Sequence, residues 1–93
     1  MFEIEYSNIS KKFLKNLDKE LLSRIFERLE KLKIDPVPQD SKFIRRDGNE
    51  KVFRYRIGKC RVLYKIKESE KVILVTKIDK RDKVYDWGFK RKI

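Results

Sequence analysis

The chain has 93 residues, 44% of them charged, and a formal net charge of +11. A single cysteine excludes an intramolecular disulfide, and the absence of histidine removes both the commonest metal ligand and the usual proton shuttle at neutral pH. The longest uncharged apolar runs, such as residues 72–76, are too short to span a bilayer, and the acidic N-terminus is unlike a signal peptide. We therefore expect one soluble, cytoplasmic domain over residues 1–93, with no metal and no other cofactor.

The positive charge is unevenly distributed along the chain. Residues 1–50 contain 11 basic and 10 acidic residues, whereas residues 51–93 contain 15 basic and 5 acidic residues, a net charge of +10. Such a localised basic field indicates a nucleic acid or an acidic protein as partner. Abundant Lys and Glu are also typical of thermophilic proteins, so part of the charge can concern heat stability.

The first third of the chain predicts a strand followed by helices. Residues 2–6 alternate between apolar and acidic side chains, which indicates a short, half-buried strand. Ser7 or Asn8 can cap a helix whose apolar residues have helical spacing, and Asp18 can cap a second helix that continues to about Lys33.

A break separates the two helical patterns, and prolines end the second one. The polar corner at residues 16–19 favours a helical hairpin, with one bent helix as the alternative. Pro36 and Pro38 stop the helix and begin a connector. Residues 43–44 are then predicted to form a short strand before a turn at residues 47–48.

Residues 51–64 predict a tight β-hairpin around a two-residue loop, Gly58-Lys59. This loop fixes the register, because the residues on either side of it must pair with each other. The register places apolar side chains opposite one another on one face of the hairpin. The apolar pairs are Ile57 with Cys60, Tyr55 with Val62, and Phe53 with Tyr64.

The other face of this hairpin carries Arg54, Arg56 and Arg61, with Arg56 directly opposite Arg61. Like charges that face each other in a sheet repel, so this arrangement favours an anion-binding site. The alternative is an ordinary solvated face of a hairpin with alternating polarity.

The remaining sequence predicts one further strand and a basic end. Residues 72–75 are apolar without alternation, which predicts an interior strand covered on both sides. Residues 80–92 are basic and aromatic, with a turn or short helix expected near residues 84–87. The order of elements predicts an α+β fold, in which a helical hairpin packs on one face of a twisted, mainly antiparallel sheet. The arginines would then lie on the opposite, concave face.

Most enzyme signatures are absent from the sequence. It has no glycine-rich phosphate loop, no Cys/His metal cluster and no Ser-His or Cys-His pair. The arginines, lysines and tyrosines that remain suit a phosphodiester, because guanidinium groups bind phosphate oxygens and stabilise developing negative charge. RNA supplies its own nucleophile, the 2′-hydroxyl group.

Two segments together resemble the RelE/ParE toxin superfamily. They are Phe-Arg-Tyr-Arg-Ile-Gly-Lys-Cys-Arg-Val-Leu-Tyr-Lys-Ile at residues 53–66 and Lys-Arg-Asp-Lys-Val-Tyr at residues 80–85. The helical hairpin, the proline-containing connector and the chain length also match, so the resemblance covers nearly the whole chain. It implies a RelE-like fold and a toxin of a type II toxin–antitoxin system. In the RelE-like branch, such a toxin cleaves mRNA in the ribosomal A site, blocks translation and is neutralised by a small RelB-like antitoxin, expected here to be acidic.

The resemblance also implies three catalytic positions. Arg61 and Arg81 match arginines that are expected to grip the scissile phosphate and stabilise its transition state. Tyr85 matches a tyrosine that is a candidate general base for the 2′-hydroxyl group. A local ion pair of Arg81 with Asp82, and plain packing of Tyr85, are the simpler alternatives.

Three further positions match residues that bind RNA. Arg54 and Arg56 correspond to basic strand residues that contact mRNA, and Lys83 corresponds to a supporting basic position. A well-studied form of the pattern has lysines at the two strand positions. Arginine binds phosphate well but transfers protons poorly, since its pKa exceeds about 12. If those lysines move protons in relatives, this chain must use another group.

Two other functions remain compatible with the same fold. One is a ParE-like toxin that inhibits DNA gyrase by binding, without nuclease activity. The other is a relative that only binds nucleic acid. The joint presence of Arg61, Arg81 and Tyr85 with a basic strand pair favours the nuclease.

Overall fold

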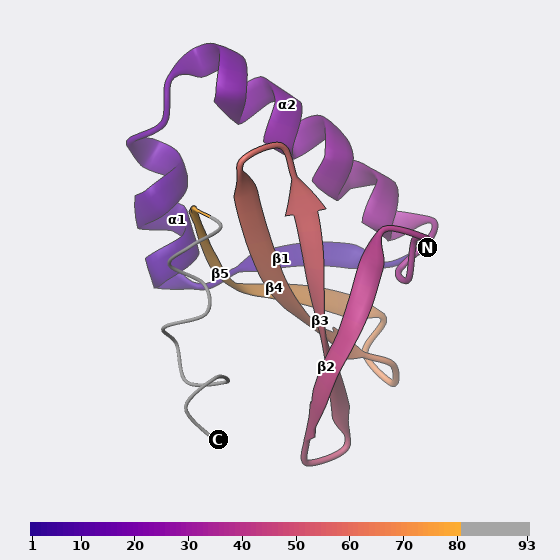
Figure 1. The fold of residues 1–93 in the computed structure, drawn as a ribbon. Coiled ribbons are helices and arrows are strands. Elements are labelled where there is room, and N and C mark those ends of the chain that lie inside the picture. The colour runs from indigo at the N-terminus through magenta and orange to yellow at the C-terminus, as the bar shows by residue number, and fades with distance from the viewer. Residues whose placement is uncertain (81–93) are drawn as a thin grey trace.

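A five-stranded sheet carries two helices on one of its faces (Figure 1). The computed structural model describes residues 1–80, so the turn or helix expected near residues 84–87 lies outside the described residues. Neither helix in residues 1–80 has the length and apolar character needed to cross a membrane. The elements are β1 (Glu3–Tyr6), α1 (Asn8–Lys15), α2 (Lys19–Glu30), the 3-10 turn η1 (Lys31–Lys33), β2 (Ser41–Asp47), β3 (Glu50–Ile57), β4 (Cys60–Lys67) and β5 (Val72–Lys80).

The strands lie in the order β1-β5-β4-β3-β2. Strands β2 to β5 pair with their neighbours in antiparallel fashion, whereas β1 runs parallel to β5. The predicted α+β fold with a mainly antiparallel sheet is therefore confirmed. The interior position expected for the strand that begins at Val72 is also confirmed, because β5 lies between β1 and β4.

Both helices begin at capping side chains that the sequence indicates. The Ser7 hydroxyl accepts a hydrogen bond from the Ser10 backbone N–H at 3.1 Å. The Asp18 carboxylate accepts one from the Leu21 backbone N–H at 2.9 Å. Each cap satisfies an N–H group that the first helical turn leaves without a partner. The chain turns sharply between the end of α1 at Lys15 and the start of α2 at Lys19, so the two helices form a hairpin and the alternative of one bent helix is wrong.

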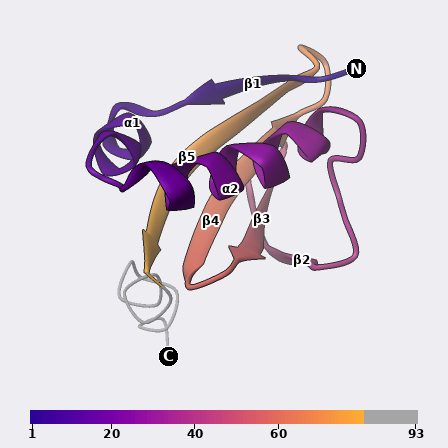
Figure 2. The ribbon, with the colours of Figure 1, turned by 90° about the horizontal axis from the view of Figure 1, so that it is seen from above.

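The core lies between the helices and one face of the sheet. Figure 2 shows α2 crossing over β3, β4 and β5, while α1 packs against β5. Ile9 and Phe26 have helical spacing with the core residues but are 57% and 39% exposed, because the helix layer is open to solvent on its outer side. The buried core residues of the helices and η1 are Leu14, Ile25, Leu29 and Leu32, and those of the sheet are Phe53, Tyr55, Ile57, Cys60, Val62, Tyr64, Ile66, Ile73, Val75 and Ile78.

The central hairpin has the register that its two-residue loop predicts. Ile57 pairs with Cys60, and every apolar pair expected from this register is present. Gly58 has a φ of +58°, and this left-handed conformation at the first loop position matches the twist that tight hairpins require. The apolar side of the hairpin faces the helices and is buried, so the charged side faces away from them.

Two expectations for the neighbouring strands need correction. Strand β5 is covered fully on one side only: Ile73 and Val75 are buried, whereas Val72 and Leu74 are half-buried. The reason is that both helices of the described chain lie on the same side of the sheet. Strand β2 is also longer than the predicted residues 43–44, because it pairs with β3 along its whole length.

The proline-containing connector is fastened to the sheet by a buried tyrosine. The Tyr64 hydroxyl donates a hydrogen bond of 2.6 Å to the Pro36 carbonyl oxygen. On the same connector, Asp40 forms an ion pair with Arg28 of α2 at 3.0 Å. These contacts fix the path from the helix layer into β2.

Candidate functional site

The sheet face turned away from the helices carries a concentration of basic residues, and we call it the basic face. Its side chains can be followed in rows across neighbouring strands, because paired residues in a sheet project to the same side. The strand pairings give two adjacent basic rows. The first row is Lys42, Arg54, Leu63 and Lys77, and the second is Arg56, Arg61 and Asp79.

The three predicted arginines all lie on this face, and their burial differs. Arg61 is 6% exposed, Arg54 is half-buried and Arg56 is exposed. Arg56 and Arg61 are directly opposite each other, as the hairpin register requires. On its other side Arg61 faces Asp79 of β5, so one carboxylate offsets part of the positive charge of the second row.

At the opposite end of the basic face, acidic side chains form ion pairs with the basic ones. Lys65 lies 3.1 Å from Asp47 and 3.7 Å from Glu50, and Arg45 lies 3.9 Å from Asp47. The hydrogen bond and charge of Lys65, followed by the charge of Arg45, hold the pKa of Asp47 below its usual value. Here acidic and basic residues alternate, whereas the two basic rows hold five cations and one carboxylate. An anion would therefore bind at the basic rows.

A β-bulge in β5 brings two residues of these rows to the basic face. Leu63 of β4 pairs with Lys77, but the next residue, Tyr64, pairs with Val75, so Thr76 is an extra residue in β5. Without this bulge, strict alternation from Val75 would direct Lys77 toward the helices. With it, Lys77 and Asp79 share the side of the sheet on which the arginines lie.

The bulge is held in place from the start of α1. The Ser7 hydroxyl donates a hydrogen bond of 2.8 Å to the Thr76 carbonyl oxygen, and the buried Ser10 hydroxyl donates one of 3.2 Å to the Val75 carbonyl oxygen. The Thr76 hydroxyl in turn donates to the Leu63 carbonyl oxygen at 3.2 Å. These bonds satisfy backbone groups near the point where the regular ladder is interrupted.

The structure describes three of the six predicted site residues. Arg54, Arg56 and Arg61 are brought together as the sequence predicts, whereas Arg81, Lys83 and Tyr85 lie outside the described residues.

Sequence reasoning missed Lys42, Lys77 and Asp79. From the sequence, Lys77 and Asp79 belong to an uninterrupted strand. Nothing in the run Val-Ile-Leu-Val-Thr-Lys-Ile-Asp indicates the bulge that turns both side chains to the basic face. The charge of these three side chains is the only feature of the sequence that could indicate a role in the site.

The thiol of Cys60 lies on the opposite side of the hairpin from the arginines. It is buried in the core, and burial, followed by the negative charge of Asp79, raises its pKa. A buried thiol with a raised pKa forms little thiolate, which is the nucleophilic form. Cys60 therefore acts as a small core residue, as expected.

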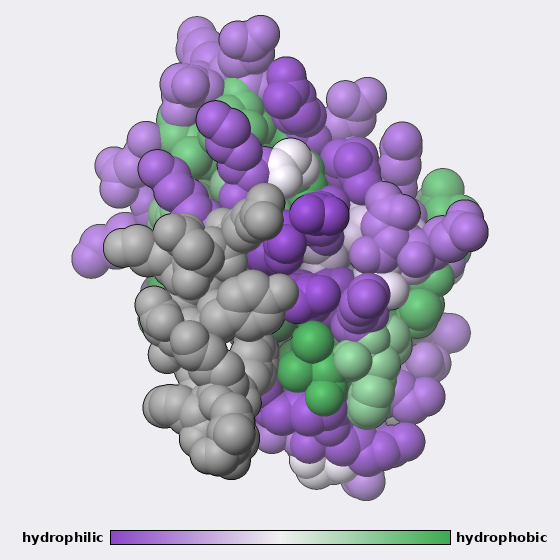
Figure 3. Space-filling model, in the orientation of Figure 1, coloured by the Kyte–Doolittle hydropathy of each residue, from purple (hydrophilic) through white to green (hydrophobic). Residues whose placement is uncertain are grey.

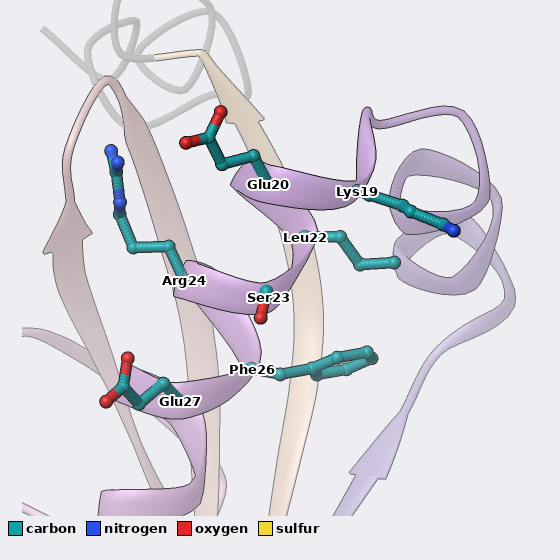
Figure 4. A pocket seen from close by; sticks show the side chains of 7 residues that line it. All are labelled: Lys19, Glu20, Leu22, Ser23, Arg24, Phe26 and Glu27. Carbon is teal, nitrogen blue, oxygen red and sulfur yellow. The ribbon is translucent and has the colours of Figure 1, made fainter.

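The outer surface of the helices offers a different kind of site. A hollow along α2 is lined mainly by charged residues together with Leu22 and Phe26. Figure 4 shows Leu22 and Phe26 pointing toward α1 and β1, while Glu20, Arg24 and Glu27 point to the other side. This hollow lies on the helix layer and shares no residue with the basic face. Among the residues that Figure 3 colours by hydropathy, most on the side drawn are hydrophilic. The basic rows remain the best candidate for phosphate chemistry.

Comparison with known proteins gives consistent matches over most of the chain. A family model described as the ParE toxin of type II toxin–antitoxin systems, parDE, matches residues 4–85. A protein of Methanocaldococcus jannaschii named "Putative toxin RelE1" is 35% identical over 85 residues, which are 90% of this chain and 94% of that protein.

Solved structures of toxins share the fold. The chain resembles an archaeal RelE–RelB complex from Pyrococcus horikoshii with a TM-score of 0.78 and 28% identity, over 86% of this chain and 94% of that one. It also resembles the isolated RelE toxin of E. coli, with a TM-score of 0.69 and 18% identity over the whole of both chains. At that identity the second match supports the fold alone.

Proposed function

We propose, because this chain belongs to the RelE/ParE family of type II toxin–antitoxin toxins, that it is a ribosome-dependent endoribonuclease that cleaves mRNA in the A site. The observation that carries this proposal is the position of three arginines on one face of the sheet, in rows with a large excess of positive charge. Such a surface suits the phosphodiester backbone of a single RNA strand. Cleavage of mRNA at the A site would block translation.

The attack needs no metal-bound water, because RNA carries the attacking hydroxyl. The 2′-oxygen loses its proton and bonds to the adjacent phosphorus, while the bond from phosphorus to the 5′-oxygen breaks. Arg61 and Arg81 would stabilise the negative charge that builds up on the phosphate oxygens. Tyr85 would accept the proton of the 2′-hydroxyl group as general base.

The remaining basic residues would hold the RNA strand in position. Arg54 and Arg56 would contact the mRNA backbone from β3, and Lys83 would support them. Positioning matters in this reaction, since the attacking and leaving oxygens must lie in line on opposite sides of the phosphorus.

An acidic RelB-like antitoxin is the partner we propose for this toxin in the cytoplasm. The similar protein of Pyrococcus horikoshii was solved as a RelE–RelB complex. A net charge of +11 favours a partner of opposite charge, and an acidic segment that covers the basic face would exclude mRNA. The same antitoxin would therefore restore translation by masking the site.

The proposal is tested by mapping the ends of mRNA from cells that express this chain. Primer extension should find cuts at A-site codons for the wild type and no cuts for Arg61→Ala or Arg81→Ala. Arg46→Ala is the matched control, because Arg46 is an exposed arginine of the same sheet that pairs with Lys51 on the helix side. It should leave the cuts unchanged. Circular dichroism of each purified variant verifies that the fold is kept, which matters most for the buried Arg61.

The same experiment separates the proposal from its alternatives. Intact mRNA together with arrested DNA supercoiling would show the gyrase inhibition of a ParE-like toxin. Intact mRNA with normal growth would contradict both kinds of toxin activity. Cuts that persist in both arginine variants would show that the catalytic residues lie elsewhere.

A further inference from the structure

We propose that Lys77 is a further catalytic residue of this ribonuclease, and that its ammonium group donates a proton to the leaving 5′-oxygen of the RNA. This inference rests on the proposed function and extends it to a residue on β5. Three features support this inference. They are the place of Lys77 in the sheet, the bulge that puts it there, and the inability of the neighbouring arginines to transfer protons.

Lys77 belongs to the same row as the RNA-binding Arg54. The row crosses four strands, and only Leu63 separates Lys77 from Arg54. The adjacent row contains Arg61, which is opposite Asp79, two residues after Lys77 in β5. A phosphate held by Arg54 and Arg61 therefore lies within the reach expected for the long, flexible side chain of Lys77.

The bulge at Thr76 is what gives Lys77 this position. Four hydrogen bonds hold the bulge: the Val75 carbonyl accepts from the Ser7 backbone N–H at 2.9 Å and from the Ser10 hydroxyl at 3.2 Å, the Thr76 carbonyl accepts from the Ser7 hydroxyl, and the Thr76 hydroxyl donates to Leu63. Bulges commonly redirect a side chain next to an active site. Here the bulge moves a lysine from the helix side to the substrate side and returns Ile78 to the core.

Lysine can donate a proton to a leaving group, which the arginines on this face do poorly. A guanidinium group keeps its proton at any physiological pH, whereas a lysine ammonium can give its proton to an alkoxide and recover one from water afterwards. The 2′-oxygen bonds to phosphorus and its proton passes to the general base, the bond to the 5′-oxygen breaks, and the 5′-oxygen takes a proton from Lys77. The products are a 2′,3′-cyclic phosphate and a 5′-hydroxyl group.

The test uses two mRNAs on programmed ribosomes, one normal and one with sulfur in place of the scissile 5′-oxygen. A thiolate leaves without a proton, since thiols have a pKa of about 8.5 and are far more acidic than alcohols. We expect Lys77→Ala to slow single-turnover cleavage of the normal mRNA by about 10²-fold or more, the typical size of a general-acid effect. The Lys77→Ala variant should cleave the mRNA with sulfur at the scissile position nearly as fast as the wild type does.

Two companion variants separate charge and folding from proton transfer. Lys77→Arg keeps the charge and should be nearly as slow as Lys77→Ala on the normal mRNA. Lys67→Ala is the matched control, because Lys67 is a half-buried lysine of the same sheet that pairs with Val72, away from the basic rows. It should cleave both mRNAs at the wild-type rate.

Each remaining outcome has a definite meaning. Equal loss on both mRNAs would show that Lys77 contributes only charge, and an unchanged rate for Lys77→Ala would show that it is not catalytic; either result overturns the inference. If instead the wild type leaves both mRNAs intact, the proposed ribonuclease itself is wrong, which is a different failure.

Discussion

Arg61 combines a permanent positive charge with near-complete burial. A buried cation lowers the stability of a fold unless opposing charges or hydrogen bonds compensate for the lost water. In the sheet this residue has Asp79 on one side and Arg56 on the other, so the strand pairing supplies one attractive and one repulsive neighbour. This balance is expected at a site that is arranged for an anionic substrate and not for maximal stability.

Tyr6 provides a prediction for the dependence of stability on pH. Burial, with the charge of Glu30 adding to it, raises the pKa of Tyr6 to about 12, whereas an unfolded tyrosine has a pKa of about 10. Between these values the folded state holds the proton more tightly, so this contribution to stability is complete below pH 10 and is lost as the pH rises toward 12. In urea unfolding from pH 9 to pH 12, Tyr6→Phe should therefore lose less stability than the wild type. Parallel curves for the two proteins would contradict this prediction.

At the scale of elements, the start of α1 and the bulge of β5 form one unit. Ser7 caps the helix through its side chain and also donates a hydrogen bond to the bulged Thr76. Asp18 caps α2 in the same way, through a hydrogen bond with the exposed Leu21 N–H group. Ser7 and Asp18 therefore both cap a helix, but only Ser7 also forms a hydrogen bond to the sheet.

This difference predicts different effects of two similar substitutions. Asp18→Ala should lower the free energy of unfolding by about 1 kcal/mol, the usual value for a lost helix cap. Ser7→Ala should lower it by more, because it also removes the hydrogen bond to the Thr76 carbonyl oxygen. Only Ser7→Ala should also slow mRNA cleavage, because it loosens the bulge that positions Lys77. Urea unfolding and single-turnover cleavage, measured where both variants are folded, check the prediction. Equal activity of the two variants would show that the bulge does not depend on Ser7.

At the scale of the whole molecule, the sheet divides the protein into two different sides. One side carries the helices and the core, and the other carries the basic rows, so an anion held by the basic rows would lie on the side of the sheet opposite the helices. Four of the five cations of the basic rows, Arg54, Arg56, Arg61 and Lys77, lie on β3, β4 and β5, which belong to the basic part of the chain.

Salt dependence should reveal which side binds RNA. Binding to a single strand releases counterions, and each phosphate contact contributes about 0.7 to the slope of log K against log salt. We expect Arg56→Ala to reduce this slope by about 0.7, the loss of one contact, and Arg46→Ala on the helix side to change it little. Fluorescence anisotropy with a short labelled RNA at several salt concentrations gives the slopes. A larger reduction for Arg46→Ala would place the RNA on the other face.

The sequence predicts those parts of this fold that depend on local signals. The caps at Ser7 and Asp18 and the loop at Gly58 each need only a few neighbouring residues, and all three are confirmed. The bulge at Thr76 depends on hydrogen bonds from Ser7, nearly 70 residues earlier in the chain, so no local pattern could indicate it.

The same limit applies to the candidate site. The facing arginines follow from the hairpin register, which is local. Lys77 and Asp79 join them only because of the bulge, and the half-buried state of Leu74 depends on both helices lying on one side of the sheet. Long-range contacts of this kind are not encoded in a short window of sequence.

The parallel pairing of β1 with β5 also has a consequence for how the protein is made. Glu3 pairs with Val72 and Tyr6 with Val75, so β1 leaves the ribosome nearly 70 residues before its neighbour in the sheet. Until β5 has emerged, β1 and the Ser7 hydroxyl lack their hydrogen-bond partners in the sheet, and β4 has an exposed edge. Long-range closure of this kind is slow compared with local hairpin formation. The sheet, and with it the basic face, should therefore be completed late in synthesis.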